Sequence, residues 1–495
     1  MAQTTKAIVS HDTLDNKGWK MEEVSLRDLQ EGELLVEMVA SGVCHTDALI
    51  GGIPGGAAPI AFYPRVLGHE GHYSNNTPRT FSDACLFEGS GYVRKVGPGV
   101  SVAAEGDPVL LSFAFCEKCE ICKTGGHSNC NLFNELNFGP HPTFHHASKS
   151  GEPEIGGCFF GQSSFANWSI VKSCSVVNVK GLVTEKKDLQ LFSPLGCGIQ
   201  TGSGTVVNVS GAGEKDSICI LGLGGVGLSA IMGAKIQGCR QIIGVDRVES
   251  RLKLAKELGA THVIDGSNLP EGKDLSAVIK EIADGVGPSI TIDTTGAPVL
   301  MDAGVKFTRN KGKYIQVGSP PFDYTLGNVT GFELMISGKQ WIGAIEGGAY
   351  PPEYVPKMIQ WYREGRFPID KMAKFMKADE FNQALHEMHT GSDLVEQQQH
   401  HDLTLPYVAQ ITKEKYHKRN IKKRPHFFFG GFKSSVQTFA SDSIQSNNQH
   451  LNPLKYPNGI DPSAGGSRQF FPCKTSQCTP SPLIPTGGTQ SLPSG

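Results

Sequence analysis

The sequence lacks the features of membrane, secreted and nucleic-acid-binding proteins. No run of about 18 apolar residues occurs in it, so we expect no transmembrane helix. The first twelve residues contain no apolar segment of the kind found in secretory signals, so we expect a cytoplasmic protein. A net charge of −2 provides no overall positive field for nucleic acid or acidic lipid. Without such a signal, the 13 cysteines are better explained as thiols or metal ligands than as disulfides.

The composition changes near residue 392. Residues before this point alternate between apolar strands, amphipathic helices and glycine turns, whereas later residues are rich in Gln, Lys, Ser, Asn and Pro. Residues 453–495 hold eight prolines in 43 positions. A segment of this composition cannot bury enough apolar surface to offset the entropy lost on ordering, so we expect the tail 393–495 to be disordered. The basic run 413–424 is typical of nuclear signals and nucleic-acid patches, but it lies in this tail, and we expect no nucleic-acid partner.

The periodicity predicts an α/β protein with two kinds of sheet. Residues 1–198 favour short strands between Gly and Pro turns, whereas residues 215–318 alternate strictly between strand and helix. Such alternation predicts a doubly wound parallel sheet with helices on both faces. The expected early strands are 33–41, 91–97, 107–113 and 165–171. The expected strands of the parallel sheet are 217–223, 241–246, 261–265, 289–296 and 313–318, and the expected helices are 225–238, 248–260, 275–285, 355–365 and 379–391.

A glycine-rich turn lies between the first strand and the first helix of this alternation. It reads G-x-G-x-x-G, formed by Gly222, Gly224, Gly225, Val226 and Gly227 around Leu223. The first glycine permits a tight turn, the second lets the backbone approach a pyrophosphate, and the third allows close packing of helix on strand. The helix N-terminus then faces the phosphates. The turn therefore predicts a dinucleotide-binding Rossmann fold.

The residue at the end of the next strand predicts which dinucleotide is bound. Asp246 lies 19 residues after Gly227. A carboxylate there accepts hydrogen bonds from the ribose hydroxyls and repels a 2′-phosphate, which favours NAD over NADP. Arg247 is the counter-argument, because a guanidinium there can pair with a 2′-phosphate.

Four cysteines in 15 residues predict a metal site. Cys116, Cys119, Cys122 and Cys130 read C-x2-C-x2-C-x7-C. Four thiolates at this spacing can close a tetrahedron around Zn²⁺ and leave no position for substrate, so the predicted site is structural. An iron–sulfur cluster is the alternative, but a ferredoxin run places its fourth cysteine after three residues and follows it with Pro, not Asn131.

Three short fragments carry further metal-binding residue types. These are Cys44 in GVCHTD, His69 in GHEG and Cys197 in LGCG. A single His or Cys is more often a core or surface residue than a ligand. Because these fragments occur together with a four-cysteine loop and a dinucleotide-binding fold, they indicate a second metal site.

With these fragments in view, the chain resembles the zinc-dependent medium-chain alcohol dehydrogenases, especially the aryl (benzyl) alcohol dehydrogenases. The resemblance covers residues 6–71 and 90–392 and depends on GVCHTD, GHEG, the four-cysteine loop, CNLFNELNFG, FFGQSSFA, PLGCGIQTG, GLGGVG and GAIEGG. It implies a GroES-like catalytic domain over 1–198, a Rossmann NAD-binding domain over 199–345 and a return to the catalytic domain over 346–392. It also implies two zinc ions per chain and a homo-oligomer, either dimer or tetramer.

The resemblance assigns roles to individual residues. Cys44, His69 and Cys197 are implied to bind the catalytic zinc, with Asp47 and Glu70 as neighbouring carboxylates that tune it.

Thr46 is implied to accept the substrate proton and His45 to contact the coenzyme pyrophosphate. In many relatives a His five residues after the first Cys ligand ends the proton relay. Leu49 stands there in this chain, so the proton must leave through ribose and solvent or through His45.

The implied reaction is hydride transfer between a primary alcohol, of the aromatic or allylic kind, and NAD to give the aldehyde, with zinc as the Lewis acid. The glutathione-linked formaldehyde dehydrogenase branch shares GVCHTD and is an enzymatic alternative. Phe113 has two interpretations: it lines an apolar pocket for the substrate, or it is a core residue on a strand.

The chain departs from the family pattern in two places. Residues 72–89 are inserted directly after GHEG, and they are either a lid or the product of a short intron kept in frame. After residue 392 the usual last strand is missing, which predicts an unpaired sheet edge. A product that binds NAD but has a damaged catalytic domain is therefore a third hypothesis.

Overall fold

The computed structural model divides the chain into two compact units, residues 1–418 and 419–495. All residues that it describes lie in the first unit. The described residues are 3–14, 16, 18–42, 47, 50–58, 60–68, 89–147, 154–321, 324–325, 329–383 and 409–412. Cys44, His45, Thr46, Leu49, His69, Glu70, nearly all of the insert and most of the tail thus lie outside the described residues.

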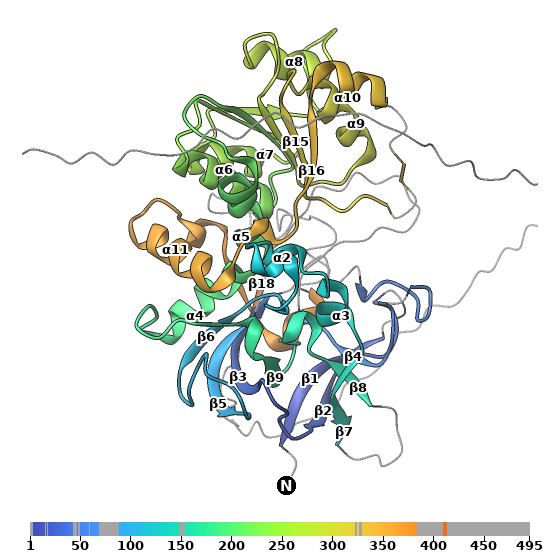
Figure 1. Cartoon of the computed structure of the whole chain (residues 1–495), viewed down its shortest axis with the longest axis vertical. Coiled ribbons are helices and arrows are strands. Elements are labelled where there is room, and N and C mark those ends of the chain that lie inside the picture. The colour runs from blue at the N-terminus through green and yellow to red at the C-terminus, as the bar shows by residue number, and fades with distance from the viewer. Residues whose placement is uncertain are drawn as a thin grey trace, which may run out of the picture. The chain divides into compact units, whose positions relative to one another are not determined.

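A closed barrel forms the first part of the described chain (Figure 1). Its strands occur in the order β1-β2-β7-β8-β4. They are β1 (Thr4–Ser10), β2 (Trp19–Leu26), β7 (His141–His146), β8 (Ile155–Gly157) and β4 (Arg65–Val66). Strand β4 ends three residues before His69, so the barrel sets the start of the GHEG fragment.

A seven-stranded sheet accompanies the barrel, in the order β10-β6-β5-β3-β18-β17, with β9 also paired to β3. Its strands are β3 (Glu33–Gly42), β5 (Ser90–Val96), β6 (Pro108–Leu111), β9 (Trp168–Lys172), β10 (Val176–Asn178), β17 (Lys374–Lys377) and β18 (Ala409–Thr412). The four early strands expected from the sequence are confirmed as β3, β5, β6 and β9.

The predicted unpaired edge is wrong. Strand β18 lies antiparallel to β3, with Ile411 opposite Ser41, and parallel to β17. The sequence Ala-Gln-Ile-Thr contains two β-branched residues, Ile411 and Thr412, a residue type that is enriched in strands. It fills the position expected to be empty.

The parallel sheet is confirmed. It has six strands in the order β13-β12-β11-β14-β15-β16, each parallel to its neighbours. The strands are β11 (Ser217–Leu221), β12 (Gln241–Asp246), β13 (His262–Asp265), β14 (Ile290–Asp293), β15 (Lys313–Gln316) and β16 (Gln340–Gly343). Strand β11 is buried throughout, and its side chains alternate between two clusters: Ile218 and Ile220 in one, Cys219 and Leu221 in the other. Helices therefore cover both faces.

Eight of the described helices have seven residues or more. They are α4 (Lys186–Phe192), α5 (Gly198–Gly204), α6 (Gly225–Ile236), α7 (Glu249–Leu258), α8 (Leu275–Ile282), α9 (Pro298–Phe307), α10 (Gly331–Ser337) and α11 (Pro351–Arg363). Two shorter ones, α2 (Glu120–Lys123) and α3 (Phe133–Phe138), belong to the four-cysteine region. Helices α6, α7, α8 and α11 confirm predictions, whereas residues 384–391 of the expected last helix lie outside the described residues.

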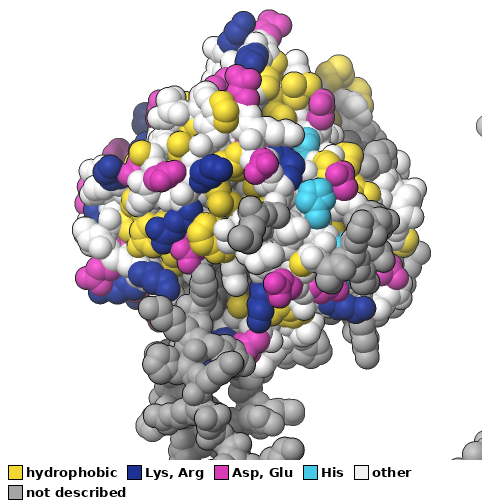
Figure 2. Space-filling view, turned by 90° about the horizontal axis from the view of Figure 1, so that it is seen from below, with side chains coloured by type: hydrophobic (Ala, Val, Ile, Leu, Met, Phe, Trp, Pro, Cys, Tyr) yellow, Lys and Arg dark blue, Asp and Glu magenta, His cyan; other side chains and the backbone are white. Residues whose placement is uncertain are grey.

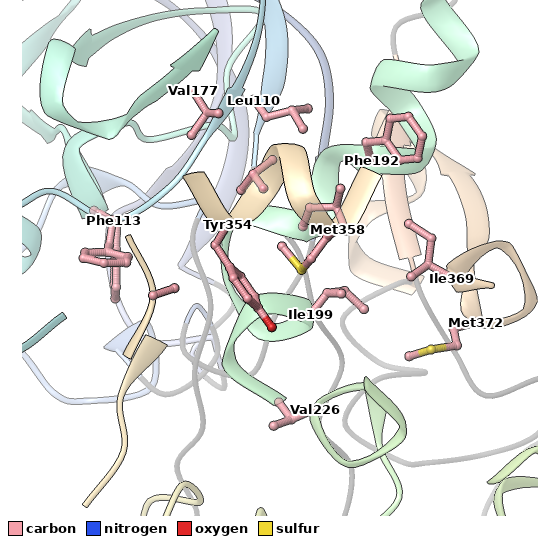
Figure 3. Packing of buried hydrophobic residues seen from close by; sticks show 14 of the residues in the cluster. Leu110, Phe113, Val177, Phe192, Ile199, Val226, Tyr354, Met358, Ile369 and Met372 are labelled. Atoms are coloured by element: carbon pink, nitrogen blue, oxygen red, sulfur yellow. The ribbon is translucent and has the colours of Figure 1, made fainter. Parts of the chain in front are cut away.

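The core continues from the seven-stranded sheet, with Leu110 of β6 and Val177 of β10, to the helices (Figure 3). Tyr354 and Met358 of α11 pack near Ile199 of α5, and the Tyr354 hydroxyl donates to Ser203 Oγ at 3.2 Å. Phe113 is fully buried, with its ring 5.7 Å from Phe115, which supports its interpretation as a core residue. Helix α5 is thus held by α11 directly after Cys197.

The surface carries charges of both signs. Figure 2 shows Lys and Arg side chains intermixed with Asp and Glu over the described part of one face. Among the described residues, no helix has the length and hydropathy needed to cross a bilayer.

Candidate active site

The glycine-rich turn leads from β11 directly into α6. Gly222 adopts a φ of +87°, and a Cβ there would lie 2.7 Å from Thr294 Oγ1. A Cβ on Gly227 would lie 1.9 Å from the Gly222 carbonyl oxygen, which no side chain can tolerate. Gly224 precedes the first turn of α6, and no described side chain caps that turn. Its N–H groups, including those of Gly225 and Val226, are therefore available to an anion.

Asp246 is fixed beside this turn. Its Oδ2 accepts from the Leu223 N–H at 2.7 Å, and its Oδ1 accepts from the N–H groups of Arg247 and Val248 at 2.7 and 3.0 Å. Arg251 adds an ion pair at 3.9 Å. The carboxylate is therefore held at the end of β12 against the glycine-rich turn, whereas the Arg247 side chain is exposed.

The four cysteines meet in space. The sulfur atoms of Cys116, Cys119, Cys122 and Cys130 all lie within 4.8 Å of one another. Four sulfurs bound at roughly 2.3 Å around one Zn²⁺ stand about 3.8 Å apart, so the donor set fits a tetrahedral zinc. Among the described residues this is the one such group of metal-binding side chains.

Backbone N–H groups donate hydrogen bonds to two of these sulfurs and so stabilise the thiolate form that binds a cation. Cys119 N–H donates to Cys116 Sγ at 3.3 Å and Cys122 N–H to Cys119 Sγ at 3.4 Å. The hydrogen bond from Cys122 lowers the pKa of Cys119 to about 6, whereas burial raises the pKa of Cys122 to about 12. A bound cation therefore has to displace the protons of the more buried sulfurs.

Aromatic rings connect this loop to a distant turn. The His127 ring stacks on the Tyr350 ring, with their centroids 4.3 Å apart. The centroid of the Phe115 ring lies 4.9 Å from that of His127 and 5.8 Å from that of Tyr350. Tyr350 follows the 3-10 turn η6 (Glu346–Gly348). The four-cysteine loop thus packs against the segment that leads into α11.

Cys197 lies at the start of α5 and is buried. Its Sγ donates to Glu346 Oε1 at 3.4 Å, while Gln200 Nε2 donates to Glu346 Oε2 at 3.0 Å. Burial raises the pKa of Glu346 to about 7, although hydrogen bonds from Gln200, Cys197 and Thr201 act to lower it. A thiol and a carboxyl group thus meet in a site shielded from water.

Helix α5 brings this cysteine to the glycine-rich turn. A Cβ on Gly202 would lie 1.9 Å from the Val226 carbonyl oxygen, and Ser229 Oγ donates to the Gly198 carbonyl oxygen at 3.4 Å. Helices α5 and α6 are therefore in backbone contact. One begins at Cys197 and the other at the turn, so a group held by Cys197 and a molecule held by the turn share one region.

Asp47 is the other described member of the expected catalytic set. It is fully buried, and its Oδ1 accepts from the Gly68 N–H at 2.8 Å, one residue before His69. Gly68 has a φ of +102°, and a Cβ on it would lie 2.4 Å from the Phe165 nitrogen. Asp47 thus holds the backbone just before His69, and Cys197 is a residue of a type that binds zinc. Cys44, His69 and Glu70 lie outside the described residues, so the second zinc site stays a prediction.

The sequence analysis missed two buried charged residues near this region. GAIEGG was noted as a motif, but Glu346 received no role, although an acid between apolar residues and two glycines was a signal. Arg65, just before GHEG, is 2% exposed, with its guanidinium 4.2 Å above the Phe62 ring and 4.7 Å above the Phe159 ring. Burial lowers the pKa of Arg65 to about 9.

Comparisons with known protein families give two matches. Residues 71–180 match the GroES-like domain of alcohol dehydrogenases, and residues 225–364 match the zinc-binding dehydrogenases. The first contains the four cysteines, and the second begins inside the glycine-rich turn.

Several individual proteins are similar over most of their length. Geraniol dehydrogenase from Castellaniella defragrans is 36% identical over 363 residues, which cover 72% of this chain and 88% of that protein. S-(hydroxymethyl)glutathione dehydrogenase from Paracoccus denitrificans is 28% identical over 79% of this chain and 98% of that protein. The crystal structure of benzyl alcohol dehydrogenase from Acinetobacter calcoaceticus aligns with a TM-score of 0.67 and 33% identity, covering 83% of this chain and 99% of that one.

Proposed function

Since the chain belongs to the zinc-dependent medium-chain alcohol dehydrogenases, we propose that it interconverts a primary aromatic or allylic alcohol and its aldehyde, with NAD as coenzyme. Two relatives support this substrate class. Geraniol is an allylic primary alcohol and benzyl alcohol an aromatic one, and the proteins so named are 36% and 33% identical to this chain. In both alcohols the carbon that loses hydride stands next to a π-system, which stabilises the resulting aldehyde.

One observation carries the proposal. Cys197 and the glycine-rich turn begin two helices, α5 and α6, whose backbones touch at Gly202 and Val226. Hydride transfer requires the alcohol carbon and the nicotinamide to be held in contact. The helix pair supplies this proximity through rigid elements.

In this proposal Cys44, His69 and Cys197 hold the catalytic zinc. When bound, the metal supplies Lewis acidity that lowers the pKa of the alcohol. Asp47 fixes the backbone that leads to His69 through its hydrogen bond with Gly68. We place Glu70 beside the metal as a second carboxylate that tunes its ligands.

The substrate proton leaves through Thr46. A hydroxyl there accepts it and passes it towards the coenzyme ribose. Because Leu49 cannot continue the relay, His45 or solvent receives the proton next, and His45 also contacts the pyrophosphate.

NAD binds along the turn formed by Gly222, Gly224, Gly225, Val226 and Gly227. The free N–H groups of the first turn of α6 receive the pyrophosphate. Asp246 receives the adenosine ribose, and its hydrogen bonds to the turn hold it ready for this contact. The exposed Arg247 side chain can approach the same ribose from solvent.

The four-cysteine group binds the structural zinc in this proposal. Its four sulfurs fill all tetrahedral positions, so its contribution is to the fold of residues 116–130.

Oxidation of S-(hydroxymethyl)glutathione is the second candidate. A relative of that name matches over 98% of its own length, at 28% identity. The same zinc, NAD and hydride chemistry would serve it, so only the substrate separates the two.

The test combines zinc analysis of the full chain with a substrate panel. We expect two zinc ions per chain and NAD reduction with benzyl alcohol and geraniol. Reduction only with formaldehyde plus glutathione would establish the second candidate. One zinc and no turnover would instead support a non-catalytic NAD-binding product, and deletion of residues 72–89 should then restore the second zinc if the insert is the cause.

We further propose that two copies associate through the coenzyme-binding part. Phe332, Met335 and Ile336 of α10 are each about two-thirds exposed, at 66%, 68% and 65%, and β16 is the last strand of the six-stranded sheet. An apolar patch beside a sheet edge is typical of a protein interface. The cytoplasm suits such an enzyme, because none of the nine described cysteines forms a disulfide.

A further inference from the structure

Glu346 is a buried acid that the reaction as proposed does not use. Its side chain is 4% exposed, and both carboxylate oxygens have defined donors. Oε1 accepts from Cys197 Sγ at 3.4 Å and Oε2 from Gln200 Nε2 at 3.0 Å. Burying a carboxyl group is costly, so a residue without a task in this position would be expected to be apolar.

The backbone at this position is also unfavourable for a residue with a side chain. Glu346 adopts a φ of +52°, and Gly347 and Gly348 follow at +62° and +59°. The left-handed region strongly favours glycine, and the next two positions have it. Non-glycine residues persist in this region chiefly where the surroundings hold them for a function.

The turn itself is held from two sides. A Cβ on Gly347 would lie 2.3 Å from the Gln200 carbonyl oxygen, so the turn lies directly on the backbone of α5. On the other side, Tyr350 stacks on His127 of the four-cysteine loop at 4.3 Å. The carboxyl group is therefore presented to Cys197 by a rigid support.

Gln200 completes the arrangement. Besides Glu346, its Nε2 donates to Ser112 Oγ at 3.1 Å and to the Gly196 carbonyl oxygen. Ser112 Oγ also donates to the Gly196 carbonyl oxygen, at 2.6 Å. The residues on both sides of Cys197 are thus tied to one polar group of side chains that includes Glu346.

From these contacts we infer that Glu346 is a positioning residue for Cys197. It fixes the first turn of α5 through Oε2 and Gln200, and it faces the sulfur through Oε1. With Cys197 bound to zinc as a thiolate, the proton of this contact lies on Oε1, which then donates to the sulfur. The inference rests on the proposed function, because it concerns Cys197 as a ligand of the catalytic zinc. It goes beyond that function by assigning a residue outside the three ligand fragments to the metal site.

The variant Glu346→Gly distinguishes the role of the carboxyl group from that of the backbone conformation, because it removes the side chain and keeps a residue that suits the left-handed region. Glycine suits the left-handed conformation, so a role limited to the shape of the turn predicts an unfolding temperature equal to or above that of the wild type. A positioning role predicts faster loss of the catalytic zinc, because groups that orient ligands typically contribute 10–100-fold to metal affinity. The control is Lys311→Gly, which makes the same backbone change at an exposed residue with a φ of +61°.

The first measurement is the release of zinc to a chromogenic chelator from the holoenzyme. We expect two ions per wild-type chain, with one released about tenfold faster or more in Glu346→Gly, and unchanged release in Lys311→Gly. Release at the wild-type rate in Glu346→Gly would overturn the inference while leaving the proposed function intact. A single zinc in the wild type would overturn both.

Glu346→Gln keeps the size of the side chain and serves if the glycine variant does not fold. In the enzyme reconstituted with cobalt(II), an amide in place of the carboxyl group should shift the sulfur-to-cobalt absorption band, with both ions retained. A purely structural role predicts the wild-type band, because glutamine fills the same space. An unchanged band would therefore also overturn the inference.

Discussion

At the scale of single residues, the described side chains of the proposed site have hydrogen-bond partners within the protein in the absence of any ligand. Asp246 receives three N–H groups, and Asp47 holds Gly68. Cys197 is tied to Glu346. Such preorganisation reduces the cost of ordering these groups when substrate and coenzyme bind.

Asp246→Ala should weaken the preference for NAD. Loss of hydrogen bonds from a carboxylate costs about 1.5–3 kcal/mol, so we expect the ratio of kcat/KM for NAD over NADP to fall roughly 10–100-fold. Steady-state kinetics with both coenzymes measures this ratio. Asp265→Ala, at the paired position of the neighbouring strand β13, is the control and should leave it unchanged. An unaltered ratio in Asp246→Ala would exclude the proposed ribose contact.

Glu33 predicts a dependence of stability on pH. Arg27 binds its carboxylate with two nitrogens, at 2.7 and 2.8 Å. Burial acts to raise the pKa of Glu33, but these hydrogen bonds and the Gln30 N–H lower it below its ordinary value of 4.5. The pair therefore stabilises the fold fully above pH 4.5, and this contribution is lost as the pH falls through the lowered pKa.

We expect Glu33→Gln to reduce the free energy of unfolding by about 2–3 kcal/mol at pH 7. The difference from the wild type should shrink progressively below pH 4, where the wild-type carboxylate is protonated as well. Urea unfolding at a series of pH values measures this. Glu353→Gln, on an exposed position of α11, should show no such trend.

At the scale of secondary-structure elements, the chain is most predictable where neighbours in sequence are neighbours in space. Alternating strands and helices, and the turn from Gly222 to Gly227, depend on local periodicity and on glycine conformations. The contact of Glu346 with Cys197 joins residues far apart in the sequence, and no local pattern encodes it. Likewise, strand β18 was missed because its four residues lie in a polar tail, and only pairing with β3 makes them a strand.

The pairing of β18 with β3 is expected to support the end of β3, which leads to Cys44. Strand β18 pairs with residues 40–42 of β3, which lead into GVCHTD at Gly42, and lies between β3 and β17. Ile411→Pro removes an N–H from the interior of this sheet, and we expect a loss of roughly 1–3 kcal/mol in the free energy of unfolding.

Thermal unfolding and zinc content together measure the effect of Ile411→Pro. We also expect lower occupancy of the catalytic zinc, because the end of β3 sets the start of the Cys44 fragment. Ile411→Val, which keeps the N–H and the β-branched side chain, is the control. Wild-type stability in the proline variant would show that β18 does not support the sheet.

At the scale of the whole molecule, the described residues combine a barrel and sheet, which carry described residues of both proposed zinc sites, with a parallel sheet that carries the proposed coenzyme site. Helix α5 joins the two by contacting both α6 and η6. The insert 72–89 follows GHEG directly. Because His69 lies outside the described part of the chain, damage to the catalytic domain by the insert stays a hypothesis for zinc analysis.

If two copies associate through α10, a charged residue in its apolar patch should prevent the association. Met335→Asp places a charge in the apolar patch of α10, where burial of an unpaired charge opposes association. We expect the mass measured by light scattering at micromolar concentration to fall from dimer to monomer. Val299→Asp changes an equally exposed apolar residue, 71% exposed, on α9 and should leave the dimer intact. A wild-type chain that is already monomeric would overturn this proposal.

The stack of His127 on Tyr350 also bears on how such an enzyme can be recombined. The two rings belong to the four-cysteine loop and to the segment after η6, which are separated by the entire coenzyme-binding sheet in the sequence. A chimaera that receives its four-cysteine loop from a relative therefore inherits only one half of this contact. Exchange of the loop together with residues 346–350 keeps the pair matched, so these two segments are a single unit of inheritance.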